Sequence, residues 1–573
     1  MQIIKSLIKL FVFICPVAGF AQSTYLNQGS KDYHFIDRLE IKQQTNTDLN
    51  FSTLKPYNRR YIIQEAGFLD SARFGYTDST GMDMYKEWTD LALTPVDEYN
   101  MQSLFMNNSE WYKGPQEGFT SRKPVLKAFY KTKANFYEVN TKDFFLAVNP
   151  VLQLSFGKEQ DNDEALYFNS RGVTVRGMIG KKIGFSAYMT ENQERGPTYF
   201  KEMVGGLRAV PGVGFYKPFK TQGVDYFDAR GYITFNAAKY IDFQLGYDKN
   251  FIGNGYRSLF LSDWGNSYLF AKINTRIWKF NYQNIFMELM PQFTKKGDSL
   301  LPRKYAAMHH LSMNVTKWLN IGLFEGVVFG RKDHFDFQYL NPIIFYRHIE
   351  GTVGSPDNAV AGLDFKANVA HRLQFYGQVL LDEFKLDRIK ANDGWWANKY
   401  GIQLGAKYID AFGVKNLDLQ GEVNRVRPFT YSHYDTIANY THYNQPLAHP
   451  LGANFNEIIG IINYQPGPKW YIHARALFYQ KGLDSSGYNA GGNIFRNYTE
   501  RFNIDNGYDV AGGKKMTVLN ALLSLSYEFR QNLFFDASIQ QRNFKFEGSA
   551  ASTQSTFATL GVRLNMFRRQ YDY

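Results

Sequence analysis

Two short segments combine aromatic rings with amides and hydroxyls, a composition that suits sugar binding. One reads Asp393-Gly-Trp-Trp-Ala-Asn398 and the other reads Tyr440-Thr-His-Tyr-Asn-Gln445. A sugar ring has an apolar face and a rim of hydroxyls, so it can stack on a flat side chain while polar groups bind its edge. Trp395 and Trp396 fit equally well into the aromatic girdle of a membrane interface. The two segments therefore predict glycan binding, with a girdle as the alternative for the tryptophans.

Other chemistry-bearing residues lack the spacing of a catalytic or metal site. No Gly-x-Ser-x-Gly elbow occurs in the chain. His309 and His310 are adjacent, and adjacent side chains of a strand point to opposite faces, so they do not readily share an ion. The same alternation separates Asp382 from Glu383, which excludes them as the paired carboxylates of a glycosidase. We therefore expect no catalytic residue, no metal and no cofactor.

Length and composition limit the class of protein. The chain has 573 residues, 44% hydrophobic and 17% aromatic, which is far too much burial-prone surface for a disordered protein. No uncharged apolar run of about 18 residues follows the amino terminus, so a helical membrane protein is excluded. Residues 1–21 are expected to be a secretory signal peptide, with an apolar stretch from Leu7 to Phe20 and small residues at Gly19 and Ala21.

Cleavage after Ala21 changes the chemistry of the exported chain. It removes the single cysteine, Cys15, and with it any disulfide, thiolate metal site or thiol nucleophile. It also removes Lys5 and Lys9 and no acidic residue, which lowers the formal charge from +12 to +10. A mild basic excess fits contact with anionic lipid or glycan, and ordinary solvated lysines explain it as well.

Residues 22–123 are expected to form a partly helical periplasmic region. Thr94 and Asp97 have the spacing of a capping box and Pro95 stands at the first helical position, which predicts a helix from Pro95 to about Asn107. Apolar spacing predicts a further helix from Met82 to Leu93.

Residues 124–573 alternate between apolar and polar side chains. Between Leu519 and Phe529 the odd positions are apolar or aromatic, while most even positions are polar, and the run after the turn at Gln531 and Asn532 repeats this pattern. A soluble sheet shows such alternation too, but the export signal, the long strands and the aromatics at strand ends favour a closed transmembrane barrel. Allowing roughly 25 residues for each strand with its connection, we predict about 18 strands. The expected fold class is all-β, a large antiparallel transmembrane barrel with a small helical periplasmic element.

One carboxylate stands out within the predicted barrel. Glu325 lies in the run from Ile321 to Phe329, with apolar neighbours at both odd and even positions. Exposure of a carboxylate to lipid is costly, so we expect Glu325 to face water or to form an ion pair that braces the lumen.

Several longer motifs extend this interpretation. They are Asn254–Ser262, Asn341–Arg347 with Gly354–Asn358, Gly377–Glu383, Arg427–His433 and Tyr440–Asn454. Together they resemble the outer-membrane capsule assembly family of Wzi type, including its gliding-motility RemB-like members. The likeness spans roughly residues 144–564.

The resemblance implies a non-enzymatic surface lectin. It implies an 18-stranded outer-membrane barrel, with a helical element on the periplasmic side, that retains surface polysaccharide. For the gliding relatives it implies a part in surface movement or adhesin handling. It adds to Trp395 and Trp396 a set of matched polar positions as glycan-binding candidates: Arg257, Asn341, Arg347, Asp357, Asn358, His442, Gln445, His449 and Asn454. Each of these has loop packing or lumen bracing as its alternative role.

The expected location is the cell outer membrane. We expect a surface polysaccharide and outer-membrane lipid as partners, and no nucleic acid, because the chain is exported. A scaffold for motility or secretion proteins and a diffusion porin are the alternative functions. Barrels commonly end on an aromatic residue, and here the chain continues past Phe567, so the last strand is expected to end at Phe567 or to fray.

Overall fold

The computed structural model describes residues 23–46, 48–74, 93–291, 300–343, 345–485, 487–502, 504–549 and 552–573. The expected signal peptide, including its cleavage site and Cys15, lies outside these residues. The helix expected from Met82 to Leu93 also falls almost entirely outside them.

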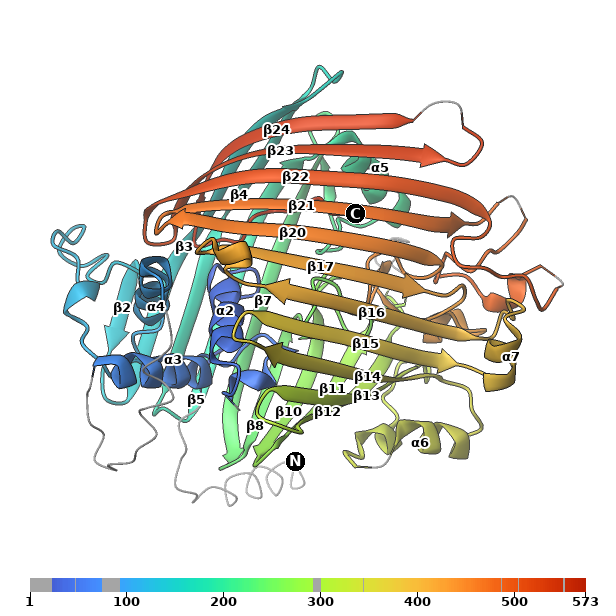
Figure 1. Cartoon of the computed structure of the whole chain (residues 1–573), viewed down its shortest axis with the longest axis horizontal. Coiled ribbons are helices and arrows are strands. Elements are labelled where there is room, and N and C mark those ends of the chain that lie inside the picture. Colours follow the sequence, from blue (N-terminus) through green and yellow to red (C-terminus); the bar gives the residue numbers. More distant parts are fainter. Residues whose placement is uncertain are drawn as a thin grey trace.

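Eighteen antiparallel strands form one closed barrel (Figure 1). Each strand pairs with its neighbours along the chain, and β24 pairs with β3 to close the ring. The strands are β3 Phe144–Glu159, β4 Ala165–Ile179, β5 Ile183–Arg195, β7 Gly223–Ala238, β8 Ile241–Asp248, β10 Tyr268–Ile277, β11 Phe280–Leu289, β12 Lys304–Asn314, β13 Leu319–Phe329, β14 Asn358–Val369, β15 Leu373–Glu383, β16 Lys399–Tyr408, β17 Leu417–Val426, β20 Phe455–Gly467, β21 Trp470–Leu483, β22 Lys514–Arg530, β23 Leu533–Phe546 and β24 Thr553–Leu564. The predicted fold class and the predicted strand number are confirmed.

Shorter elements lie inside the barrel or beside it. The short strands are β1 Leu54–Lys55, β2 Tyr137–Asn140, β6 Lys217–Phe219, β9 Phe251–Ile252, β18 Thr441–His442 and β19 Gln445–Pro446. The α-helices are α2 Asp32–Gln43, α3 Arg59–Phe74, α4 Pro95–Asn107, α5 Thr198–Leu207, α6 Tyr346–Thr352 and α7 Leu386–Ala391. Among the residues that the structure describes, no helix is both long enough and apolar enough to cross a membrane.

The alternating sequence gives the barrel wall two chemically different faces. On β22, Leu519 and Leu523 are exposed on the outside, whereas Asn520 and Ser524 are buried inside the lumen. This is the predicted division, and its cause is the period of two along a strand. The exterior is therefore apolar, as contact with hydrocarbon requires.

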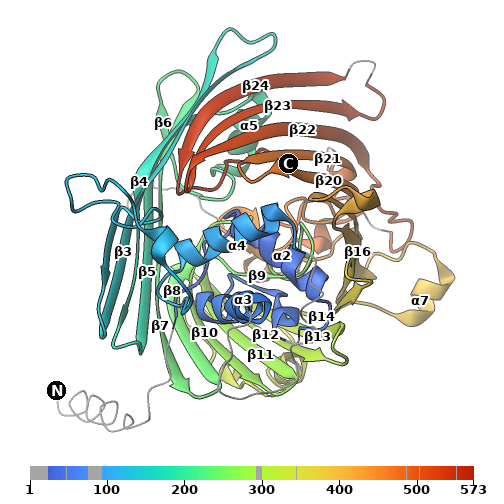
Figure 2. The same cartoon turned by 60° about the vertical axis from the view of Figure 1, so that its left-hand side comes forward.

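The two ends of the barrel differ in the length of their connections. Two residues join β22 to β23, whereas residues 330–357, 427–454 and 484–513 form long loops at the opposite end. Outer-membrane barrels keep short turns in the periplasm and long loops outside the cell. Helices α2, α3 and α4 lie across the end with the short turns (Figure 2), and the rule for outer-membrane barrels predicts that this end faces the periplasm.

Helix α4 begins and ends where the sequence predicts. The backbone N–H of Asp97 donates to Thr94 Oγ1 at 3.1 Å, and the backbone N–H of Thr94 donates to Asp97 Oδ2 at 3.0 Å, which completes the capping box. The helix packs with α2 and α3 around a small core of its own that includes Leu39, Ile63 and Phe105.

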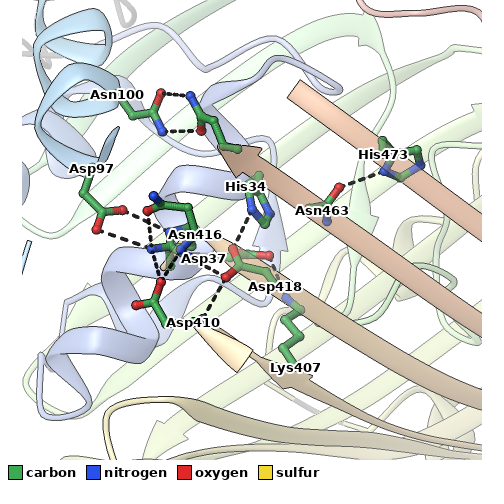
Figure 3. Close-up of polar contacts among 12 residues, drawn as sticks. His34, Asp37, Asp97, Asn100, Lys407, Asp410, Asn416, Asp418, Asn463 and His473 are labelled. Carbon is green, nitrogen blue, oxygen red and sulfur yellow. Dashed lines mark hydrogen bonds and ion pairs between the residues drawn. The ribbon is translucent and has the colours of Figure 1, made fainter. Parts of the chain in front are cut away.

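A cluster of charges fixes this helical element to the barrel (Figure 3). The guanidinium of Arg38 in α2 lies 3.0 Å from Asp97 of α4 and 3.1 Å from Asp410 in the turn after β16. It also donates to Asp418 at the start of β17. Because the side chains of Arg38 and Asp97 are almost fully buried, these ion pairs are shielded from water.

Candidate functional site

Two loop segments fold back into the extracellular half of the lumen. They comprise residues 251–267 and 427–454, and we call them the plug. The ring of Phe260 stacks on Phe324 of the barrel wall, with the ring centroids 4.5 Å apart. The Tyr440 hydroxyl donates to the Phe260 carbonyl at 2.6 Å, and Lys304 Nζ of the wall donates to the Asn439 carbonyl at 2.7 Å. The plug is thus held by apolar packing and by hydrogen bonds to its own backbone.

The periplasmic helical element contacts the plug directly. Strand β1 of that element pairs with β9 of the plug, with Leu54 opposite Ile252. The backbone N–H of Gly253 adds a hydrogen bond to the Thr53 carbonyl at 2.8 Å. A continuous set of contacts therefore runs through the lumen from the periplasmic end to the extracellular end.

The segment after the last strand also enters the lumen. Strand β24 ends at Leu564, before Phe567, and residues 568–573 turn inward. The Arg569 guanidinium lies 3.1 Å from Glu194 on the inner wall, and Asp572 lies 2.9 Å from Arg257 of the plug. Ion pairs with lumen residues therefore draw this segment inside, and it neither continues the strand nor frays.

A cleft of about 740 Å³ opens between the plug, α5 and the inner wall at the extracellular mouth. We call it the rim cleft. Figure 1 shows α5 behind strands β21 to β24, which form the wall of this cleft. Its lining combines aromatic rings (Tyr199, Trp264, Tyr479, Phe495, Phe544) with side-chain amides (Gln160, Asn162, Asn493, Gln554). This is the mixture of flat apolar rings and hydrogen-bonding groups that suits a sugar.

Several charged residues of the rim cleft already have partners in the protein. Glu159 accepts from the backbone N–H of Thr198 at 2.9 Å, and Asp484 accepts from Arg496 at 2.8 Å. The Arg542 guanidinium lies over the ring of Tyr199 at 4.7 Å. The charges thus hold the walls in place, and rings, amides and aliphatic side chains such as Leu207, Leu451 and Met516 line the rest of the cleft.

Sequence reasoning missed Trp264, the ring that the plug contributes to the cleft. Its ring is partly buried and meets Tyr573 edge to face at 6.3 Å. The surrounding stretch Ser262-Asp-Trp-Gly-Asn266 shares Asp, Gly, Trp and Asn with the segment around Trp395, which is the signal that could have identified it.

The predicted pair Trp395 and Trp396 forms a different patch, near α7. Lys385 lies over the Trp395 ring at 5.3 Å, and Arg501 lies over the Trp396 ring at 4.0 Å. Both tryptophans are partly buried, and neither lines the rim cleft. Sugar contact at this patch stays a prediction.

Five of the predicted polar residues are buried within the plug region: Arg257, His442, Gln445, His449 and Asn454. The Asn454 amide donates to the carbonyls of Ala490 and Gly512 at 2.9 and 3.0 Å. His449 Nε2 lies 2.7 Å from Glu457, and Gln445 Oε1 accepts from the backbone of Gly212 at 2.8 Å. These contacts are those of bracing residues, the alternative raised from the sequence, and glycan contact stays a prediction for all five.

Of the other four predicted residues, three belong to the loop between β13 and β14, and Asn358 is the first residue of β14. Asp357 accepts two hydrogen bonds from Arg331, at 2.7 and 2.6 Å. Asn358 donates to the Tyr431 carbonyl at 3.2 Å, Asn341 accepts from the backbone of Ile343 at 3.0 Å, and Arg347 contacts Glu350 at 2.9 Å. None of the four lines the rim cleft, and their contact with glycan also stays a prediction.

Glu325 points away from the lumen, contrary to the expectation from the sequence. Its neighbour Phe324 packs against the plug, so Glu325 points to the outer side of the wall, together with Leu323. Apolar residues occupy both faces of β13, and the alternation of the sequence therefore does not reveal which way this strand is turned.

The hydrogen bonds of His442 require a neutral ring. Nδ1 accepts the backbone N–H of Met290 at 3.0 Å, which leaves Nε2 to donate to the Ser267 carbonyl, also at 3.0 Å. Burial lowers the pKa of His442 from 6.5 to about 4. Because the unfolded chain takes up this proton first, the contribution of His442 to stability is complete above pH 6.5 and is lost as the pH falls towards 4.

Replacement of His442 by glutamine is expected to reduce the loss of stability on acidification. Glutamine has no titrating group, so the difference in thermal midpoint between pH 7 and pH 4.5 should be smaller in His442→Gln than in the wild type. Other titrating groups act equally in both proteins. An identical pH dependence in the two proteins would show that the His442 ring does not carry this effect.

Comparison with known proteins supports the fold. No protein-family model matches the sequence, and a search of curated proteins found no match. Wzi, an outer-membrane protein involved in group 1 capsule assembly in Escherichia coli and a carbohydrate-binding β-barrel, is similar with a TM-score of 0.55 at 12% identity, over 95% of this chain and 100% of that chain. OprD from Pseudomonas aeruginosa is similar with a TM-score of 0.41 at 10% identity, over 73% and 94%. The chain thus has a Wzi-like fold, that of an outer-membrane β-barrel.

Proposed function

We propose that this protein is a non-enzymatic outer-membrane barrel that binds a surface polysaccharide at the rim cleft and retains it on the cell. The observation that carries the proposal is the cleft itself, with five aromatic rings and four amides around about 740 Å³ at the extracellular mouth. Volumes between about 300 and 1,000 Å³ are usual for ligand sites.

The construction of the cleft favours binding over passage through the barrel. Trp264 belongs to the plug, and Tyr199 belongs to α5, so the same segments that fill the lumen also form the cleft. A rigid surface loses little conformational entropy when it binds a ligand. A cleft built from the segments that fill the lumen favours a lectin over a diffusion porin.

The similarity to Wzi supports the proposal in a second way. The solved protein is described as carbohydrate-binding, and its whole length is covered by the likeness. At 12% identity, the similarity to Wzi supports the fold alone. The proposal of a polysaccharide as the ligand therefore rests on the rim cleft. A part in surface motility or secretion stays an alternative function.

The test is the fraction of surface polysaccharide that a strain lacking this protein releases into the medium. We expect shedding with unchanged total synthesis, and restoration of retention by the wild-type gene. Full retention in the deletion strain would contradict the proposal. Full retention together with a loss of spreading would favour the motility alternative instead.

A further inference from the structure

The loop between β13 and β14 lies against the outside of the barrel. Residues 330–343 and 345–357, which we call the outer strap, leave the extracellular end of β13 and return along the wall. Tyr339, Tyr346 and Ile349 of the strap pack in one cluster with Tyr305 and Val327. The last two residues occupy outward-facing positions of β12 and β13. Figure 1 accordingly shows α6 beside the strands and not beyond their ends.

The strap reaches the middle of the wall. Glu325 points outward, and its carboxylate accepts the backbone N–H groups of Tyr346 and Arg347, the first two residues of α6, at 2.8 and 2.9 Å. Strand β13 has 11 residues, about the length of one membrane crossing. Glu325 is four residues from the extracellular end at Phe329, which is roughly 13 Å along the strand.

Burial under the strap explains why a carboxylate is tolerated at this place. A carboxylate in contact with hydrocarbon would be left without hydrogen bonds, at a high cost in free energy. Here only 8% of Glu325 is exposed. Its cross-strand partner His309 also points outward, and the Tyr346 ring covers it with the ring centroids 3.9 Å apart. The strap therefore shields two polar groups at the depth where lipid would otherwise touch them.

Three large apolar side chains stand on the free side of the strap, beside polar residues such as Gln338, Arg347 and His348 that are also exposed. Phe337, Ile343 and Phe345 are 79%, 83% and 72% exposed. Such exposure of large apolar side chains is unfavourable in water. The wall beside the strap presents Leu323 and Leu363, which pair across β13 and β14 and are also exposed. The exposed apolar side chains of the strap thus continue those of the wall.

We propose that the outer strap is embedded in the outer leaflet of the membrane, where lipid acyl chains contact Phe337, Ile343 and Phe345. The continuity with the lipid-facing wall selects lipid as the occupant of this surface. Glu325 acts as an anchor that caps α6 from the wall and holds the strap at that depth. The inference rests on the position of the barrel in the membrane and not on the rim cleft.

The test uses nitroxide labels on single cysteines in a Cys15→Ser background, which has no other cysteine. Ile343→Cys reports on the strap and Leu363→Cys on the lipid-facing wall. Lys390→Cys on exposed helix α7 is the control in water. With the barrel in phospholipid vesicles, collision rates are measured with oxygen, which concentrates in lipid, and with a water-soluble nickel chelate.

We expect the label at Ile343 to match the label at Leu363, with high oxygen access and low nickel access. A label at Ile343 that matches Lys390 would place the strap in water and overturn the inference. Low access to both reagents would overturn it too, because protein would then cover this surface. High nickel access at Leu363 itself would contradict the membrane position of the wall and would overturn the inference as well. None of these results depends on glycan binding.

Discussion

Replacement of Arg38 by alanine is expected to release the periplasmic helical element from the barrel at a cost of about 3–5 kcal/mol, the usual effect of removing one partner from a buried ion pair. Arg38 joins Asp97 of the element to Asp410 and Asp418 of the barrel. Without it, Asp97 and Asp410 share the charge of Lys42, which lies 3.0 Å from each of them, and Asp418 keeps the contact with His34 at 2.8 Å. Uncompensated buried charge therefore makes the loss large.

Hydrogen exchange of the backbone amides in α2 measures this release. The matched control is Arg171→Ala, because Arg171 forms an ion pair with Glu191 at 3.0 Å in which both side chains are about half exposed. Exposed pairs contribute about 0–1 kcal/mol. Faster exchange in Arg38→Ala alone is the expected result. Equal exchange in both variants would mean that the core of the element, and not the charge cluster, holds it in place.

The same cluster sets how the attachment responds to acid. Burial alone would raise the pKa of Asp97, but the charges of Arg38 and Lys42, together with hydrogen bonds from Arg38 and the backbone of Thr94, outweigh burial and hold the pKa below 3.8. The pKa of Asp410 is lowered by the charges of the same two residues, Arg38 and Lys42, and by hydrogen bonds. A carboxyl with a lowered folded-state pKa contributes its full stability above its unfolded pKa and loses it as the pH falls through the lowered value. The attachment through these two residues should therefore persist down to about pH 4.

Replacement of Trp264 by alanine is expected to weaken glycan affinity by about tenfold or more. Buried aromatic contacts in binding sites commonly contribute about 2 kcal/mol, and 1.4 kcal/mol corresponds to a factor of ten. Trp264 is the tryptophan of the rim cleft, so its loss removes the largest stacking surface. Trp264→Phe keeps a smaller ring and should retain part of the affinity.

The measurement is binding of purified barrel to polysaccharide isolated from the parent strain. Trp318→Ala, at the turn between β12 and β13, removes an exposed tryptophan at the opposite end of the barrel and serves as the control. Because the Trp264 ring also contacts Tyr573, the thermal midpoint is measured for each variant. Unchanged affinity in a folded Trp264→Ala protein would remove the rim cleft as the glycan site.

The two tryptophan segments show what composition can and cannot predict. The stretches around Trp395 and Trp264 both combine tryptophan with Asp, Gly and Asn, yet only Trp264 lines the cleft. Composition indicates what a segment can bind. Its position depends on contacts with residues far away in the chain, such as the pairing of β1 with β9.

The sequence by itself determined the barrel and helix α4, because both depend on local rules. Alternation along Leu519–Phe529 assigns the faces of β22, and Thr94 with Asp97 defines the start of α4 within one turn. Only the tertiary structure decided which loops enter the lumen and which way Glu325 points. Where both faces of a strand are apolar, as in β13, the packing of distant segments against each face chooses the orientation, and no local pattern records that choice.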